Sequence, residues 1–358
     1  MNIYKSRIDK LKTIMHKNNY NAFYTSNITN VRYLSGFTGS SGFLLITDSG
    51  DHFFSDGRYI EQSKQEVYNQ VVHITPDHLK CINDEKLLHN SWNMCFEGNH
   101  LSYDMYQKIK SHCIVSELIS ENDIVENIAS VKDQTEIDAL QTAIDITDHV
   151  FDRIIPEIRP GVTEKHIASK LSYFFKQEGG DGDSYDPIVA SGKNGALPHA
   201  RPSNNEISMG DFIVMDFGSL YNGYHADMTR TVVVGKPSDK HKEIYDVVLR
   251  SQLSGINYAK SGVKCSDLDR VCRDVIDNAG YGDLFIHSTG HGLGLEVHTL
   301  PRISSLNHST LKENNVITIE PGIYIAGWGG VRIEDDCLVL KDSCRPMNKS
   351  TKELIVVG

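Results

Sequence analysis

The chain has 358 residues, and its 36 Lys and Arg against 47 Asp and Glu give a formal net charge of −11. This length favours two or three domains, and the composition excludes collagen-like, disulfide-scaffold and intrinsically disordered classes. The acidic balance argues against a dedicated nucleic-acid binder, which would carry a basic face.

The first residues and the cysteines both favour a cytoplasmic protein. Residues 1–15 carry charges throughout and lack the apolar core of a signal peptide. Ile8, Leu11 and Met15 instead mark one face of a first helix. The seven cysteines are scattered without a C-x-x-C pair, which suits free thiols in a reducing compartment. No apolar run is long enough to cross a membrane, so we expect no membrane partner.

The N-terminal part of the chain combines strand and helix signals. Short apolar segments within residues 21–34 and 42–54 are separated by Gly, Ser, Thr, Asn and Asp, which favour turns. Residues 56–59 lead into a predicted helix over 60–67. The Gly-rich segment 35–42 does not fit the phosphate-binding pattern G-x-G-x-x-G, and we predict a turn there. These signals predict a small α/β domain.

A long amphipathic helix over residues 131–155 marks the start of a second domain. Apolar residues recur there at three- and four-residue steps, and Pro156 ends the pattern. We place the domain boundary within 125–132, ahead of this helix. The expected domains are therefore 1–130 and 131–358.

The second domain changes from helix to strand signals after residue 184. Its strand-like runs are DFIVMDFG, MTRTVVVG, NVITIEPGIYI and VRIEDDCLVL. Two helical stretches, 241–259 and 265–279, interrupt them. Runs of strands separated by helices, rather than a strict alternation, predict an α+β fold.

Four carboxylates and one histidine stand where apolar strand runs should not have them. Unpaired buried carboxylates are costly, so each needs a cationic partner or a metal. A histidine flanked by glycines suits a place where the backbone approaches something closely. These five residues are Asp216, Asp227, His291, Glu320 and Glu334.

This set predicts a centre for two divalent cations. Four carboxylates supply four negative charges, and oxygen ligands with one nitrogen suit Mn²⁺, Co²⁺, Fe²⁺ or Zn²⁺. Two such ions can share a bridging hydroxide, which is a nucleophile at neutral pH. The chemistry expected is metal-assisted hydrolysis of an amide.

Period-2 geometry suggests which side chains lie beside the ligands. In a strand over 331–336, Arg332, Glu334 and Asp336 would share one face. In a strand over 227–233, Asp227 would share its face with Thr229. We therefore expect Arg332 beside Glu334 and Thr229 beside Asp227.

At these residues the sequence resembles the pita-bread metallopeptidases, and within them the proline-specific branch of aminopeptidase P and prolidase. The resemblance implies a pita-bread catalytic domain, a curved antiparallel sheet with helices outside, preceded by a smaller creatinase-like α/β domain. The motifs that carry it are ALPHARPS (196–203), MDFGSLYNGYHADMTRT (215–231), HSTGHGLGLEVH (287–298), ITIEPGIYI (317–325) and GGVRIEDD (329–336).

The resemblance also implies roles for individual residues. The two metal ions, with Mn²⁺ expected, would be held by the five residues above, with Asp216 and Glu334 shared between them. Catalytic roles fall on His199, His298, Glu320 and Arg332, with Glu320 as the proton shuttle. His199, His298, Tyr324 and Arg332 would bind the substrate. The resemblance further implies a homodimer.

The leading hypothesis is an aminopeptidase P, which hydrolyses the Xaa-Pro bond at peptide N-termini through a metal-bridged hydroxide. The alternative is a prolidase, which cleaves Xaa-Pro dipeptides. A metal-free creatinase-like amidinohydrolase and a non-catalytic binding protein are disfavoured, because all five ligands are present. One residue departs from the branch pattern: Thr299 follows His298 where an acidic residue is usual, so the substrate preference stays open.

Overall fold

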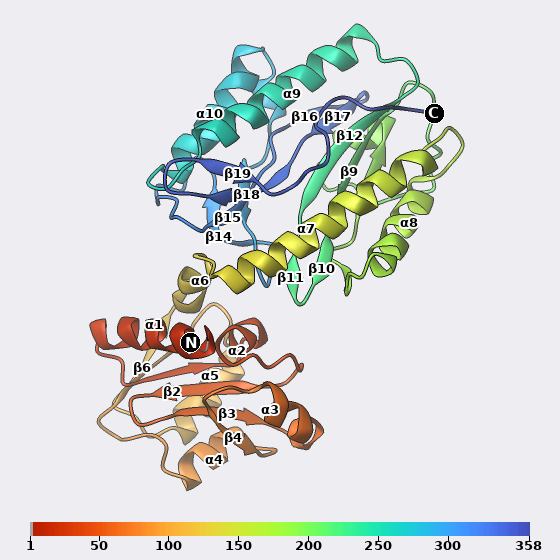
Figure 1. Cartoon of the computed structure of the whole chain (residues 1–358). Coiled ribbons are helices and arrows are strands. Elements are labelled where there is room, and N and C mark those ends of the chain that lie inside the picture. The colour runs from red at the N-terminus through yellow and green to blue at the C-terminus, as the bar shows by residue number, and fades with distance from the viewer. Residues whose placement is uncertain (1–2) are drawn as a thin grey trace. The chain divides into compact units, whose positions relative to one another are not determined.

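The computed structural model describes residues 3–358 and divides the chain into two compact units, Met1–Ala129 and Ser130–Gly358 (Figure 1). Met1 and Asn2, which begin the charged N-terminal segment, lie outside the described residues. None of the helices in the described part of the chain is long and apolar enough to cross a membrane. All seven cysteines are free thiols.

The N-terminal unit is built on a six-stranded mixed sheet in the order β4-β3-β2-β1-β5-β6. Strand β1 pairs antiparallel with β2 and parallel with β5. Its elements are α1 (Ile3–Lys17), β1 (Ala22–Thr25), α2 (Ile28–Ser35), β2 (Phe43–Thr47), β3 (Asp51–Ser55), η1 (Gly57–Tyr59), α3 (Ile60–Glu66), β4 (Val71–Ile74), α4 (His78–Asp84), β5 (Asn93–Glu97), α5 (Tyr103–His112), β6 (Glu117–Glu121) and α6 (Ile124–Ala129).

Helices cover both faces of this sheet. Side chains alternate along a strand, so Ala22 and Tyr24 of β1 point to the same face. There they join Leu79 of α4 and Ile109 of α5 in one apolar cluster. Figure 1 shows α1 and α2 against the opposite face. This arrangement confirms the predicted α/β character of the N-terminal part.

The C-terminal unit contains four sheets, in the orders β20-β12-β9-β8, β14-β13-β15-β18-β19, β11-β10-β7 and β16-β17. Its elements are α7 (Gln134–Ile154), η2 (Ile155–Glu157), α8 (Glu164–Gln177), β7 (Gly182–Asp183), β8 (Ile188–Ser191), η3 (Gly192–Ala196), β9 (Phe212–Phe217), β10 (Ser219–Tyr221), β11 (Tyr224–His225), β12 (Met228–Val234), α9 (Asp239–Tyr258), α10 (Cys265–Asn278), η4 (Gly282–Leu284), β13 (Gly290–Gly292), β14 (Thr299–Ile303), β15 (Val316–Ile319), β16 (Gly322–Ile325), β17 (Gly329–Arg332), β18 (Asp335–Val339), β19 (Cys344–Pro346) and β20 (Val356–Val357).

The helices of this unit flank its strands as two pairs. Figure 1 shows α7 and α8 on one side of the strands and α9 and α10 on the other. Helix α7 begins at a capping box, in which Asp133 accepts from the backbone of Glu136 and the Glu136 side chain accepts from the backbone of Asp133. The helices predicted over 131–155, 241–259 and 265–279 are confirmed within a few residues at each end.

Antiparallel pairing sets the register of the strands that carry the proposed ligands. Asp216 of β9 stands opposite Thr229 of β12, and Thr318 of β15 stands opposite Asp336 of β18. The predicted single strand over 331–336 is wrong. The chain leaves β17 after Arg332 and enters β18, in another sheet, at Asp335.

Candidate metal centre

Two of the five predicted ligands lie within strands and three lie just outside them, and all five come together in the C-terminal unit. Asp216 is in β9, Asp227 precedes β12, His291 is central in β13, Glu320 follows β15, and Glu334 lies between β17 and β18. The ligands are thus placed by several strands that are distant in sequence.

Short distances connect these five side chains. Ligand atoms of Asp227, His291 and Glu334 all lie within 4.8 Å of one another. Nε2 of His291 is 3.6 Å from Oδ2 of Asp227 and 3.4 Å from Oε1 of Glu320. Asp216 joins through the Tyr185 hydroxyl, which contacts Oδ1 of both Asp216 and Asp227.

Two glycines let the strand of His291 enter this crowded region. A Cβ at Gly290 would stand 2.1 Å from the carbonyl oxygen of Thr318, and one at Gly292 would stand 2.1 Å from that of Leu300. Either contact is shorter than real side chains tolerate. The glycines are therefore required by close backbone approach, as the sequence pattern suggested.

His291, one of the proposed ligands, is held as a neutral imidazole. Its Nδ1 lies 3.0 Å from the Gly292 carbonyl oxygen, which can only accept, so Nδ1 carries the proton. Burial lowers the pKa of His291 to about 4, and the charge of His298 adds to the shift. The approach to Asp227 is therefore a contact between neighbours rather than an ion pair. Nε2 keeps a lone pair directed at the carboxylates.

The carboxylates repel one another in the absence of added cations. Burial raises the pKa of Asp227 well above its usual range, and Glu334 and Asp216 add to the shift. Burial likewise raises the pKa of Glu334, and it raises that of Glu320 to about 8. Two divalent cations would supply four positive charges to this set, so the residues present fit a dinuclear centre.

Hydrogen bonds from neighbouring residues orient the ligands. Oγ1 of Thr318 accepts from the backbone N–H of His291 at 3.1 Å and donates to Oε1 of Glu320 at 3.2 Å. The Asp336 carboxylate accepts from the backbone N–H of Asp227 at 3.0 Å. Hydrogen-bond partners of this kind fix the orientation of the proposed ligand side chains before any ion binds.

Thr229 and Arg332 hydrogen-bond to other proposed ligands than those expected. Thr229 donates its hydroxyl to Glu334 at 2.6 Å rather than to Asp227. Arg332 donates through Nη2 to Asp216 at 2.5 Å and through Nε to Thr229 at 2.9 Å. The break in the strand after Arg332 explains the difference, because Glu334 no longer shares a strand face with Arg332.

A chain of hydrogen bonds leads outward from Arg332. Nη1 of Arg332 donates to the Tyr324 hydroxyl at 2.8 Å. That hydroxyl lies 2.9 Å from Nε2 of His287. Nδ1 of His287 lies 2.8 Å from the carbonyl oxygen of Ser288, so it carries the proton and Nε2 accepts from Tyr324. Burial lowers the pKa of His287 to about 4.

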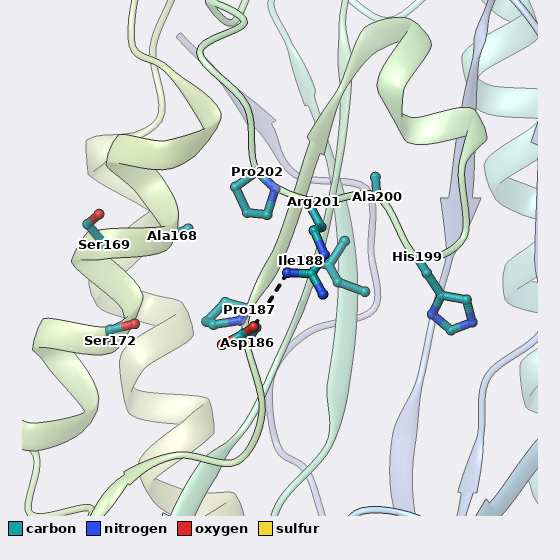
Figure 2. Close-up of a pocket in the computed structure, with 10 residues that line it drawn as sticks. All are labelled: Ala168, Ser169, Ser172, Asp186, Pro187, Ile188, His199, Ala200, Arg201 and Pro202. Atoms are coloured by element: carbon teal, nitrogen blue, oxygen red, sulfur yellow. Dashed lines mark ion pairs between the residues drawn. The ribbon is translucent and has the colours of Figure 1, made fainter.

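The two other predicted histidines lie at the edge of the centre. The ring of His298 is 4.2 Å from that of His291 between centroids, and burial lowers the pKa of His298. His199 is exposed and lines a cavity of about 460 Å³. Figure 2 shows its ring on the far side of the Arg201–Asp186 ion pair from helix α8. None of the five proposed ligands lines this cavity.

Sequence reasoning missed two residues of this region. Tyr185 lies in the loop before β8, where a tyrosine interrupts no apolar run and gives no signal. His287 opens the motif 287–298, but only the structure shows that it accepts from Tyr324. Its place as the first residue of that motif is the one feature of the sequence that points to His287.

Comparisons with known proteins cover both units. Residues 138–341 match the model of "Metallopeptidase family M24", and residues 7–130 match the "Creatinase/Prolidase N-terminal domain". The chain is 37% identical over 352 residues to the Xaa-Pro dipeptidase of Pyrococcus furiosus, covering 98% of this chain and 100% of the relative.

Solved structures of similar proteins have the same architecture. An Xaa-Pro dipeptidase from Bacillus anthracis superposes with a TM-score of 0.95 at 37% identity, covering 99% of this chain and 100% of the other. An X-Pro aminopeptidase from Thermotoga maritima gives 0.89 at 38% identity, covering 98% and 99%. These matches confirm the predicted fold class.

Proposed function

Since the chain belongs to metallopeptidase family M24, as its motifs predicted, we propose that it is an Xaa-Pro dipeptidase. The observation that carries this proposal is the largely buried set of four carboxylates and one neutral imidazole. Dipeptidases among the relatives and solved structures support the prolidase alternative better than the aminopeptidase P activity that we expected first.

The proposed ligands of two divalent cations are Asp216, Asp227, His291, Glu320 and Glu334, with Asp216 and Glu334 shared. Oxygen-rich ligation supports Mn²⁺ as the metal. When bound, such ions lower the pKa of a water molecule and stabilise negative charge on a carbonyl oxygen.

The proposed proton carrier is Glu320. Its side chain is 16% exposed and accepts from Thr318, so one carboxylate oxygen has a fixed orientation. The carboxylate would take a proton from the attacking water and return it to the nitrogen of proline as the peptide bond breaks. An amide nitrogen leaves as an amine only once it is protonated, so this proton transfer is required for the proline to leave.

The proposed substrate contacts are His298, His199 and the Arg332–Tyr324 pair. His298 lies against His291 and would donate to the carbonyl oxygen as charge develops on it. Arg332 and Tyr324 would limit the space next to Asp216. Arg332 donates both to Asp216 and to the Tyr324 hydroxyl. His199 would reach the substrate from the exposed segment after η3.

Peptide hydrolysis by the Mn²⁺-loaded protein tests the proposal. The matched substrates are an Xaa-Pro dipeptide, the same sequence extended by one residue, and the corresponding Xaa-Ala dipeptide. We expect cleavage of the Xaa-Pro dipeptide alone, lost on chelation. Equal kcat/KM on the extended peptide would establish an aminopeptidase instead, and cleavage of neither proline substrate would overturn the proposal.

Variants separate metal ligation from substrate contact in the same assay. Asp227→Asn and His291→Ala should lose both activity and bound metal. His298→Ala should keep its metal and lose roughly 100-fold or more in kcat, because it removes a donor to the developing charge. Loss of metal in His298→Ala would show that its role is wrongly assigned.

The homodimer and the cytoplasmic location are further proposals, supported by the family resemblance and the free cysteines. Light scattering and cell fractionation test them directly.

A further inference from the structure

A second group of metal-ligating side chains lies within the N-terminal unit. His73 is on β4, Cys81 is on α4, and Glu85 follows the end of α4. Nδ1 of His73 is 3.3 Å from Oε1 of Glu85 and 3.8 Å from Sγ of Cys81, and Sγ of Cys81 is 3.5 Å from Oε1 of Glu85. All three ligand atoms thus lie within 4.8 Å of one another.

These separations match a tetrahedral metal site. With bonds of about 2.3 Å to sulfur and about 2.0–2.1 Å to nitrogen and oxygen, ligand atoms at tetrahedral angles lie about 3.4–3.6 Å apart. The three observed distances fall around that range. A direct hydrogen bond between imidazole and carboxylate would be shorter, at about 2.7–2.9 Å.

The histidine of this cluster is already oriented. Its other nitrogen, Nε2, lies 3.0 Å from Nδ1 of His52 on the neighbouring strand β3. Its ring stacks on Phe54 with centroids 4.7 Å apart. A proton on Nε2, donated to His52, leaves the lone pair of Nδ1 facing Cys81 and Glu85. Histidine ligands of metals are characteristically fixed through their second nitrogen in this way.

The helix brings the other two ligands to one side. Cys81 and Glu85 are four residues apart at the end of α4, a spacing that places side chains next to each other. The side chain of His73 is 9% exposed and that of Glu85 is 49% exposed, so the cluster opens to solvent at the carboxylate. A cation can enter there, and a water molecule can take the fourth position.

We propose that His73, Cys81 and Glu85 bind one borderline divalent cation, Zn²⁺, which joins the end of α4 to β4. Thiolate, imidazole and carboxylate together select Zn²⁺ over Mn²⁺, which prefers oxygen ligands. The site is separate from the proposed catalytic centre, all of whose ligands come from the C-terminal unit and none of which is a sulfur atom.

Cobalt spectroscopy tests this site without interference from the other. Metal-free, fully reduced protein is titrated with Co²⁺, and absorption by thiolate-to-cobalt charge transfer is followed in the near ultraviolet. We expect saturating Co²⁺ to produce this band with the intensity of one thiolate-bound ion per chain, and Zn²⁺ to abolish it by displacement. Absence of the band in the full-length reduced protein would overturn the proposal.

Variants identify the ligands. Cys81→Ser should abolish the band, while Cys344→Ser, which changes the other partly exposed cysteine, should leave it unchanged. His52→Ala should weaken Co²⁺ binding about 10- to 100-fold with the band retained, as expected for loss of an orienting partner. A band that persists in Cys81→Ser would also overturn the proposal. Xaa-Pro hydrolysis should be unaffected in Cys81→Ser, so this test and that of the proposed function fail independently.

Discussion

The Tyr185 hydroxyl has one proton and contacts two carboxylates. It approaches Oδ1 of Asp216 and Oδ1 of Asp227 from the loop before β8. Burial raises the pKa of Tyr185 well above its usual range, and the two aspartates add to the shift, so the phenol stays protonated. We interpret Tyr185 as a positioning residue that sets the separation of two ligand carboxylates.

Replacing Tyr185 by Phe should weaken metal binding more than it slows turnover. The variant keeps the ring but removes the donor shared by Asp216 and Asp227, and loss of such a partner typically costs about 10- to 100-fold in metal affinity. Titration calorimetry with Mn²⁺ measures this, and kcat at saturating Mn²⁺ should fall much less.

The matched control for this prediction is Tyr281→Phe. The exposed hydroxyl of Tyr281 donates to Glu243 rather than to a proposed ligand. Its loss should leave Mn²⁺ affinity unchanged. Equal affinity in Tyr185→Phe and the unaltered protein would mean that the phenol does not position the carboxylates.

The proposed ligands could be singled out at the residue scale because a buried, unpaired carboxylate costs free energy. A carboxylate in an apolar strand run, such as Asp216 or Glu320, needs a special explanation, and that need is visible in one sequence. Tyr185 lies in a polar loop and carries no such cost. Its role depends on a contact with Asp227 that only the folded chain creates, so the sequence could not reveal it.

At the scale of elements, local periodicity predicts the helices, but it does not predict where a strand ends or which sheet it joins. Amphipathic repeats define α7, α9 and α10 without knowledge of their partners. The run VRIEDDCLVL has apolar residues before and after its three consecutive acidic residues, so it predicts one continuous strand. The structure divides it between two sheets, because Glu334 must reach Thr229, which is 105 residues away.

Helix α10 supports two ligand-bearing strands through one side chain. Oδ1 of Asp269, which is fully buried, accepts from the backbone N–H of Thr289 at 3.1 Å and from its hydroxyl at 2.9 Å. Arg273 pairs with the same carboxylate. The carbonyl oxygen of Thr289 then accepts from the backbone N–H of Glu320 at 2.8 Å. Asp269 therefore holds the start of the His291 strand next to Glu320.

Asp269→Ala should destabilise the C-terminal unit by about 3 kcal/mol. The change leaves Arg273 and Thr289 without a charged partner in a largely buried place. Calorimetric unfolding of the metal-free protein measures the effect. Asp267→Ala on the same helix removes an exposed pair with Arg270 and should cost less than about 1 kcal/mol. Equal effects of the two changes would contradict a supporting role for Asp269.

At the scale of the whole molecule, the sequence predicted the mixed architecture but not its strand order. The order β4-β3-β2-β1-β5-β6 in the N-terminal unit places consecutive strands on both sides of β1. Parallel partners such as β1 and β5 are joined through intervening segments, and each pairing depends on contacts between residues distant in sequence. Periodicity within a single strand contains no information about such a neighbour.

Each unit has its own apolar core and one tryptophan. Trp92 packs against the core of the N-terminal unit, and Trp328 packs against a core of the C-terminal unit. The chain has no further tryptophan. Fluorescence of Trp328→Phe therefore reports on the N-terminal unit alone, and that of Trp92→Phe on the C-terminal unit alone.

The two proposed metal sites predict that the two units respond to different cations. A cation present at about 1,000 times its Kd adds about 4 kcal/mol to the free energy of unfolding. For a unit as long as Ser130–Gly358, this raises the melting temperature by roughly 8–16 °C. Mn²⁺ should produce that shift in Trp92→Phe and leave Trp328→Phe unchanged. Zn²⁺ should raise the melting temperature of Trp328→Phe, and adding Cys81→Ser should remove this effect.

Stabilisation of Trp328→Phe by Mn²⁺ would contradict the assignment, because a site with a thiolate ligand has little preference for Mn²⁺. Failure of Mn²⁺ to stabilise Trp92→Phe would instead count against the carboxylate centre, since its crowded negative charges should gain most from a divalent cation.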